Sequence, residues 1–315
     1  MKRWGLLRQL VLLPGSDATS RVCPSSNPRL AVLSVPQALL TMPITPTGND
    51  IVPLYPYGDN NHNIDSVIYR WNPGTKVFEV NQTLETHGAY DWEFFSVGPY
   101  HFLVVANTFD GNNHNIDSVI YRWNPGTKVF EVNQTLETHG AYDWEFFSVG
   151  PYHFLVVANT FDGISTSINS TIYIWLGGMF QPFQYIKTVG ATDWEMFQVK
   201  DRYFLAVANG QKLNERGPSH YNINSTIYEL NVITQTFVKF QDIVTNSAVD
   251  WEFFSVGEEK FLVVANSHDG TSYSLNSVIY RWQGYEGFVP IHRLPTIGCT
   301  DWEYFNTTAG SFRLF

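Results

Sequence analysis

The sequence has little charge, almost no cysteine and no long apolar run. Two cysteines, Cys23 and Cys299, among 315 residues are too few for a disulfide framework or a four-ligand zinc site. Charged residues make up 15% and the formal net charge is −10. Phosphate binding needs an excess of lysine and arginine, so this balance argues against a nucleic-acid partner. No stretch approaches the roughly 18 apolar residues of a membrane-spanning helix.

Aromatic residues, in contrast, reach 16% of the chain, and most belong to an internal repeat. The triplet Asp-Trp-Glu occurs at 91–93, 143–145, 193–195, 250–252 and 301–303. The motif Ile-Tyr-x-Trp occurs at 68–71, 120–123, 172–175 and 279–282, and Leu230 replaces its tryptophan in the copy at 227–230. The motif Val-Ala-Asn ends at Asn107, Asn159, Asn209 and Asn266. Repeats of about 40–50 residues are typical of propellers and solenoids.

The content of one repeat favours the propeller. Four short segments, 91–97, 101–106, 118–123 and 129–136, are rich in β-branched and aromatic residues and are bounded by Gly, Pro, Asn or Asp. None has the 3.6-residue apolar period and the length of a helix. The sequence therefore predicts an all-β fold, a β-propeller of four-stranded antiparallel blades.

The repeat also predicts the domain boundaries. Residues 1–58 carry no repeat motif and are predicted to be an unassigned leader, disordered or non-native, before a propeller at 59–315. Complete blades are expected near 91–136, 143–186, 193–243 and 250–292, and the two terminal half-blades together would make a fifth and close the ring. Residues 60–111 and 112–163 are identical at every position. An exact copy indicates a very recent duplication or a mis-assembled chain.

Three linked motifs point to a family. Gly-Ala-x-Asp-Trp-Glu-x-Phe, then Phe-Leu-x-Val-Ala-Asn, then Ser-x-Ile-Tyr-x-Trp resembles the EAR repeat, also called the EPTP or epitempin repeat, over roughly residues 60–315. The resemblance implies a secreted or cell-surface protein whose propeller, seven-bladed in the family, serves recognition. For the part of the family nearest in sequence it also implies roles in hearing, in tooth and hair development and in Notch signalling. This chain holds material for about five blades.

The triplet supplies the candidate chemistry. Asp and Glu at i and i+2 of a strand project to one face, and paired carboxylates are what a glycosidase uses. An active site is a single asymmetric constellation, however, whereas the triplet stands in five equivalent places, so we expect it to be structural or to line a channel. If these strands are innermost, their aspartates would ring the channel and a structural Ca²⁺ could neutralise them. This ring would consist of Asp91, Asp143, Asp193, Asp250 and Asp301. No other cofactor is expected.

Five Asn-x-Ser/Thr sequons, with the resemblance, favour secretion and glycosylation; they are at Asn81, Asn133, Asn169, Asn224 and Asn306. The leading hypothesis is an extracellular protein-binding propeller, not an enzyme, whose partner is a cell-surface receptor or an extracellular-matrix protein. Its binding residues are expected in variable loops such as Gln211 to His220, which is longer than its counterparts. Two alternatives stay open: a propeller enzyme acting on glycans, and a non-functional fragment of a larger gene product.

Overall fold

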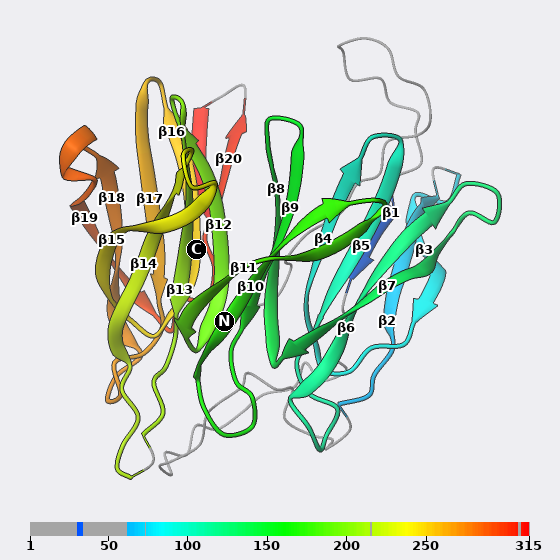
Figure 1. Cartoon of the computed structure of the whole chain (residues 1–315), viewed down its shortest axis with the longest axis horizontal. Coiled ribbons are helices and arrows are strands. Elements are labelled where there is room, and N and C mark those ends of the chain that lie inside the picture. Colours follow the sequence, from blue (N-terminus) through cyan, green and yellow to red (C-terminus); the bar gives the residue numbers. More distant parts are fainter. Residues whose placement is uncertain (1–29, 34–61, 73, 215, 308–309, 315) are drawn as a thin grey trace. The chain divides into compact units, whose positions relative to one another are not determined.

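A computed structural model describes residues 30–33, 62–72, 74–214, 216–307 and 310–314 (Figure 1). These residues form strands, loops and one 3₁₀ turn at Gly284–Glu286, and no α-helix occurs among them. The chain divides into two compact units, Met1–Glu137 and Thr138–Phe315, which are described separately. In both units every paired strand is antiparallel to its neighbour.

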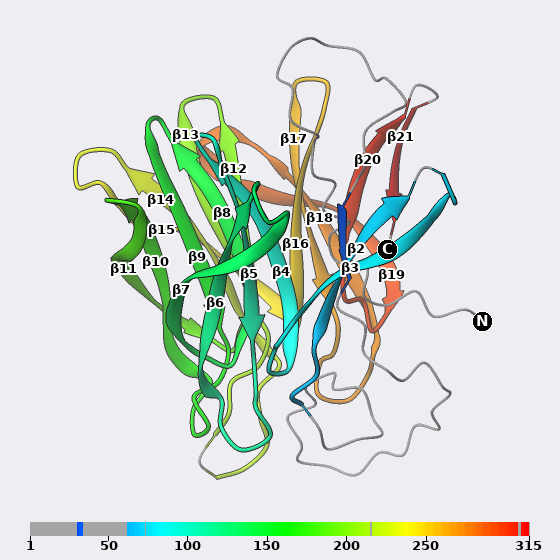
Figure 2. The same ribbon diagram turned by 90° about the vertical axis from the view of Figure 1, so that its right-hand side faces the viewer.

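The first unit contains two sheets. One has three strands in sequence order, and Figure 2 shows its β2 and β3 as a blue hairpin. Its strands are β1 (Leu30–Leu33), β2 (Ser66–Asn72) and β3 (Val77–Leu84). The other sheet has four strands: β4 (Ala89–Val97), β5 (Tyr100–Asn107), β6 (Asn115–Asn124) and β7 (Val129–His139). Strand β1 lies inside the expected leader, so a short part of residues 1–58 joins a sheet; the rest of that segment lies outside the described residues.

The second unit contains three four-stranded sheets and a hairpin. The first sheet comprises β8 (Ala141–Val149), β9 (Tyr152–Asn159), β10 (Ser167–Leu176) and β11 (Met179–Val189). The second comprises β12 (Ala191–Val199), β13 (Arg202–Asn209), β14 (Asn222–Asn231) and β15 (Thr236–Asn246). The third comprises β16 (Ala248–Val256), β17 (Glu259–Asn266), β18 (Ser274–Trp282) and β19 (Phe288–Ile297). The hairpin is β20 (Glu303–Thr307) and β21 (Gly310–Leu314). The predicted fold class, all-β with four-stranded antiparallel blades, is confirmed.

The entry to each first strand requires an unusual backbone conformation. The glycines of the Gly-Ala and Gly-Cys pairs have φ of 54–57°, a region that L side chains rarely adopt. At Gly190 a Cβ atom would also lie 2.6 Å from the carbonyl oxygen of Gln211. In the third sheet of the second unit, Ser247 takes this place with φ of 44°. The Gly-Ala pair therefore recurs because the chain turns tightly against the loop of its own sheet before it starts β12.

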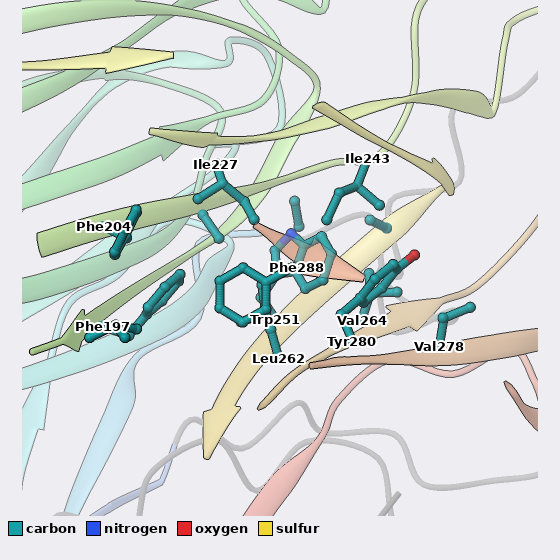
Figure 3. Close-up of a cluster of buried hydrophobic side chains, with 14 residues drawn as sticks. Phe197, Phe204, Ile227, Ile243, Trp251, Leu262, Val264, Val278, Tyr280 and Phe288 are labelled. Atoms are coloured by element: carbon teal, nitrogen blue, oxygen red, sulfur yellow. The ribbon is translucent and has the colours of Figure 1, made fainter. Parts of the chain in front are cut away.

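The core lies between neighbouring sheets. Second strands such as β13 are buried at nearly every position, as expected for sheets covered on both faces. Figure 3 shows the cluster between the sheet of β12–β15 and the sheet of β16–β19. Its labelled members are Phe197, Phe204, Ile227, Ile243, Trp251, Leu262, Val264, Val278, Tyr280 and Phe288. Burial of such apolar side chains, at about 25 cal/mol per Å², is the main force that holds the sheets together.

The cysteines contribute nothing to the framework of the described chain. Cys299, which stands where other copies of the repeat have alanine, is buried and free, as predicted for a small core residue. Burial raises the pKa of its thiol. Cys23 lies outside the described residues.

Candidate functional site

Four Asp-Trp-Glu triplets belong to the second unit, in β8, β12 and β16 and at the start of β20, and these first strands pack against one another in sequence order. In each junction the aspartate of one sheet accepts a hydrogen bond from the tryptophan backbone N–H of the next. The bonds join Asp143 Oδ2 to Trp194 N at 3.0 Å, Asp193 Oδ2 to Trp251 N at 2.8 Å and Asp250 Oδ2 to Trp302 N at 2.9 Å. The aspartate thus provides an acceptor for a buried tryptophan N–H of the next sheet, a group that would otherwise be costly to leave unpaired.

The glutamate and the tryptophan of each triplet also form hydrogen bonds to the neighbouring sheet. Each glutamate accepts the backbone N–H two residues further along the next strand: Glu145 from Met196 at 3.1 Å, Glu195 from Phe253 at 2.9 Å and Glu252 from Tyr304 at 3.1 Å. Each indole donates back to a second-strand carbonyl: Trp194 to Val157 at 3.0 Å, Trp251 to Val207 at 3.1 Å and Trp302 to Val264 at 3.2 Å. We call these three bonds per junction the triplet bonds.

The last strands of neighbouring sheets are joined by hydrogen bonds between a glutamine side chain and a phenylalanine backbone. The amide of Gln184 in β11 donates to the carbonyl of Phe237 in β15 at 2.7 Å, and its oxygen accepts the N–H of Phe237 at 2.8 Å. Gln241 bonds Phe288 in the same reciprocal way. In the first unit Gln82 pairs with Phe130. Neighbouring sheets are therefore joined by hydrogen bonds at both their inner and their outer strands.

The triplet bonds bear on the catalytic hypothesis. A glycosidase needs one carboxyl group that gives a proton to the leaving oxygen and another that is free to act as base or nucleophile. Here Asp193 and Glu195 each use an oxygen to bind the backbone of the next sheet, and their counterparts in the adjacent junctions do the same. The arrangement supports the structural interpretation of the triplet.

Packing carboxyl groups side by side perturbs their ionisation. Burial, with the negative charge of Glu303 next, raises the pKa of Glu252 from its ordinary 4.5 to about 8, although the N–H of Tyr304 opposes the shift. Burial and the charge of Glu252 raise the pKa of Glu195 well above its ordinary value. A protonated glutamic acid still accepts a hydrogen bond at its carbonyl oxygen. Protonation therefore relieves repulsion along the row without breaking the triplet bonds.

The five aspartates of the predicted ring are divided between the two units. Asp91 is buried in β4 of the first unit, and the other four belong to the second. Asp143, Asp193 and Asp250 are buried, and one oxygen of each is bonded to a tryptophan N–H, while Asp301 is partly exposed. Within the described ranges, no three His, Cys, Asp or Glu side chains gather closely enough to hold a metal ion. The calcium site stays a prediction.

The sequons differ in accessibility. Asn169 and Asn224 are exposed at matching positions near the start of β10 and β14. Asn133 is half-buried, and the amide nitrogen of Asn81 is buried without a hydrogen-bond partner. Asn306 lies in β20, where side chains are outside the description. The geometry thus leaves Asn169 and Asn224 as the sequons best placed to carry a glycan.

Contacts within the predicted binding loop hold its backbone on both sides of Glu215, which lies outside the described residues. Lys212 and His220 exchange two backbone hydrogen bonds of 2.9 Å, and the amide of Asn214 donates to the carbonyl of Pro218 at 2.6 Å. The backbone N–H of Leu213 reaches the hydroxyl of Thr166 in the adjacent sheet at 3.0 Å. The side chains of Lys212, Arg216 and His220 are exposed. The loop therefore presents basic groups on a held backbone.

An aromatic–histidine cluster in the first unit escaped the sequence analysis. His62 meets the ring of Phe109 edge-on at 4.8 Å, and His114 stacks on the same ring at 4.3 Å. Both imidazoles are half-buried, and burial lowers the pKa of each. Because the rings come from loops of two sheets, no local pattern could have indicated the contact.

The triplet bonds predict the effect of removing one carboxylate. Asp193→Ala leaves the buried N–H of Trp251 unpaired and should lower the free energy of unfolding by about 1–3 kcal/mol. Asp193→Asn keeps an acceptor oxygen at this position, so its free energy of unfolding should fall by less than that of Asp193→Ala. Asp201→Ala, an exposed aspartate at the β12–β13 turn, should stay within about 0.5 kcal/mol. Urea unfolding measures all three; equal losses for Asp193→Ala and Asp201→Ala would contradict a structural triplet.

The raised pKa of Glu252 predicts a pH-dependent stability. Between pH 4.5 and about 8 the folded chain holds a proton that the unfolded chain releases. The stability from this proton is complete below pH 4.5 and is lost as pH rises to about 8, by at most about 1.4 kcal/mol per pH unit before screening at this partly exposed group. Glu252→Gln should flatten that part of the profile. Unfolding free energies measured at several pH values test this; parallel profiles would refute it.

The relatives of the chain carry the same repeats. It is 64% identical over 253 residues to the thrombospondin-type laminin G domain and EAR repeat-containing protein of Mus musculus, which covers 79% of this chain and 38% of that protein. It is 44% identical to the protein of the same name in Homo sapiens, with 99% of this chain and 66% of that protein covered. The chain thus spans only part of both relatives. In the part of the chain with described structure, no helix is long and apolar enough to cross a membrane.

A solved structure supports the fold alone. A mutant of the α-L-arabinofuranosidase of Fusarium graminearum, bound to an iminosugar inhibitor, matches with a TM-score of 0.51 at 8% identity, over 90% of this chain and 82% of that one. The EPTP domain model matches four stretches that together exceed half of the sequence: 77–124, 129–176, 179–231 and 236–283. The chain therefore belongs to the EPTP repeat family.

Proposed function

We propose that the chain is an extracellular module that binds another protein, a cell-surface receptor or a matrix component, through its loops. The observation that carries the proposal is the ordered loop from Gln211 to His220. Its backbone is held by bonds at Lys212 and Asn214, so little conformational entropy is lost on binding. Exposed Lys212 and Arg216, with one acid at Glu215, give the loop a formal charge of +1 on a protein of net charge −10. Such a loop fits an acidic patch on the partner.

The rival hypothesis, a glycan-acting enzyme, has weaker support. The arabinofuranosidase with a similar fold is a glycosidase, but at 8% identity the likeness carries no chemistry. The curated relatives are named for their EAR repeats and laminin G domain. The triplet carboxylates are occupied by the next sheet. Hydrolysis of any member of a glycan panel would reopen the enzyme hypothesis.

Several finer roles follow the relatives and are proposals for this chain. Secretion or display at the cell surface accords with the laminin G domain in the relatives' names. The family resemblance adds hearing, tooth and hair development and Notch signalling. The alternative of a non-functional fragment stays open because the chain spans 38% of one relative. Structural calcium in the channel also stays a proposal; chelation followed by calcium addition should lower and then restore the melting temperature.

Glycosylation is a proposal that the exposure of the sequons sharpens. In secreted full-length chain, Asn169→Gln and Asn224→Gln should each remove one glycan, because both amides are exposed. Asn81→Gln should leave the mass unchanged, because the amide nitrogen of Asn81 is buried. Intact-mass spectrometry before and after enzymatic deglycosylation distinguishes these outcomes. A glycan on Asn81 alone would show that the folded structure does not govern which sequons are used.

The binding proposal predicts a loop-dependent interaction with cells. Full-length chain should bind cultured cells, and brief protease treatment of those cells should abolish the binding. Lys212→Ala with Arg216→Ala should weaken binding about fivefold or more, because rim charges steer association and contribute about 1 kcal/mol together. Lys187→Ala with Lys200→Ala, which removes the same charge at exposed sites elsewhere, is the matched control. Binding that survives protease, or an equal loss in the control, contradicts the proposal.

A further inference from the structure

The second unit contains a cavity of about 380 Å³ where β15 meets the sheet of β16–β19. It is lined by Val244, Asn246, Asn266, Asp269, Ser274, Leu275, Asn276, Val278, Tyr280, Pro290 and Arg293. Ligand pockets occupy about 300–1,000 Å³, so this one is at the small end and suits a single ring rather than an extended chain. None of these residues belongs to a triplet or to the loop of the proposed protein-binding surface.

The cavity lies where two neighbouring sheets differ at one cross-strand pair. In the preceding sheet the paired residues Thr226 and Asp242 bond each other, hydroxyl to carboxylate, at 2.8 Å. The ammonium of Lys239 bonds the same carboxylate at 2.6 Å. The corresponding pair in β18 and β19 is Val278 and Arg293. A valine offers no partner to a guanidinium, so a closed polar network is replaced by an apolar floor beside a cation.

The groups around that floor suit a particular ligand chemistry. The exposed Arg293 enters no ion pair among the described side chains and presents the planar fork that binds a carboxylate with two hydrogen bonds. The side-chain amides of Asn246 and Asn276 supply donors and acceptors for hydroxyl groups. Burial raises the pKa of Tyr280 to about 12, which keeps its hydroxyl a neutral donor.

The occupant must combine one negative charge with hydroxyls and an apolar ring face. A polyanion is disfavoured, because the chain has a net charge of −10 and the cavity is lined by one cation, Arg293, and one carboxylate, Asp269. The Oδ1 of Asp269 already accepts the backbone N–H groups of Thr271 and Ser272. We propose that this cavity binds a sugar ring bearing one carboxylate, the terminal sialic or uronic acid of a glycan, with Arg293 holding the carboxylate and Val278 beneath the ring. This site is separate from the proposed protein-binding loop and can be tested alone.

The test is a ligand-observed NMR titration of the full-length chain. The probes are N-acetylneuraminic acid and glucuronic acid, each compared with its uncharged methyl ester. We expect at least one acid to bind at least tenfold more tightly than its ester. Arg293→Gln should weaken that binding at least tenfold. Val278→Thr with Arg293→Asp, which installs the bonded pair of the preceding sheet, should abolish it. His292→Gln, exposed on the other face of β19, should leave it unchanged and is the matched control.

Several results would overturn the proposal. The carboxylate is not recognised if the esters bind as well as the acids, or if Arg293→Gln has no effect. The cavity is a plain anion site if acetate competes as strongly as the sugars. A protein rather than a glycan is the partner of this cavity if a glutamate-containing peptide binds more tightly than either acid. The absence of binding by both acids rejects the site. Circular dichroism of each variant confirms that the fold is retained.

Discussion

The hydrogen bond that the tryptophan N–H of one sheet donates to the triplet aspartate of the preceding sheet is the interaction on which the second unit depends. Apolar burial favours contact between any two sheets, but it is not directional. The bond that the Trp251 N–H donates to Asp193 is directional. Any other arrangement would leave this buried N–H unpaired, at a cost of about 1–3 kcal/mol. It fixes the register in which β12 meets β16. The cluster of Phe197, Trp251 and Phe288 then packs in the one arrangement that this register allows.

Joining the sheets through buried carboxylates has an electrostatic cost. Each junction adds an aspartate and a glutamate to a row of first strands, where burial and like charges raise the pKa of Glu195, Glu252 and Glu303. The raised pKa of Glu252 shows the response: some carboxyl groups hold a proton at neutral pH and remain hydrogen-bond acceptors. At Glu195 and Glu252 protonation removes the charge while the bond to the next sheet is kept. Loops such as Gln211 to His220 contain no triplet residue and are free to differ from one copy to the next.

The repeat made the existence and order of the strands predictable: the segments 91–97, 101–106, 118–123 and 129–136 all lie within β4 to β7, which extend up to three residues beyond them. The equivalence of the triplets also predicted a structural rather than a catalytic role. Their partners could not be predicted: a period of two places Asp and Glu on one face, but only packing shows which backbone N–H lies opposite. The cavity beside Arg293 was equally hidden, because it depends on a cross-strand pair, Val278 with Arg293, separated in sequence by a whole hairpin.

The triplet bonds run in one direction along the row of sheets, and this bears on how blades can be copied. In the second unit, the triplets of β12 and β16 each accept bonds from the following sheet through their carboxylates and donate to the preceding one through their tryptophan. A repeat that carries both halves of the joint needs no new partner: a duplicated unit can bond the sheet before it and the sheet after it with unchanged residues. Such head-to-tail joints extend naturally, as in other repeat folds. The identical segments at 60–111 and 112–163 each carry one triplet, at 91–93 and 143–145, and the residues that distinguish one sheet from another lie outside it, as Arg293 illustrates.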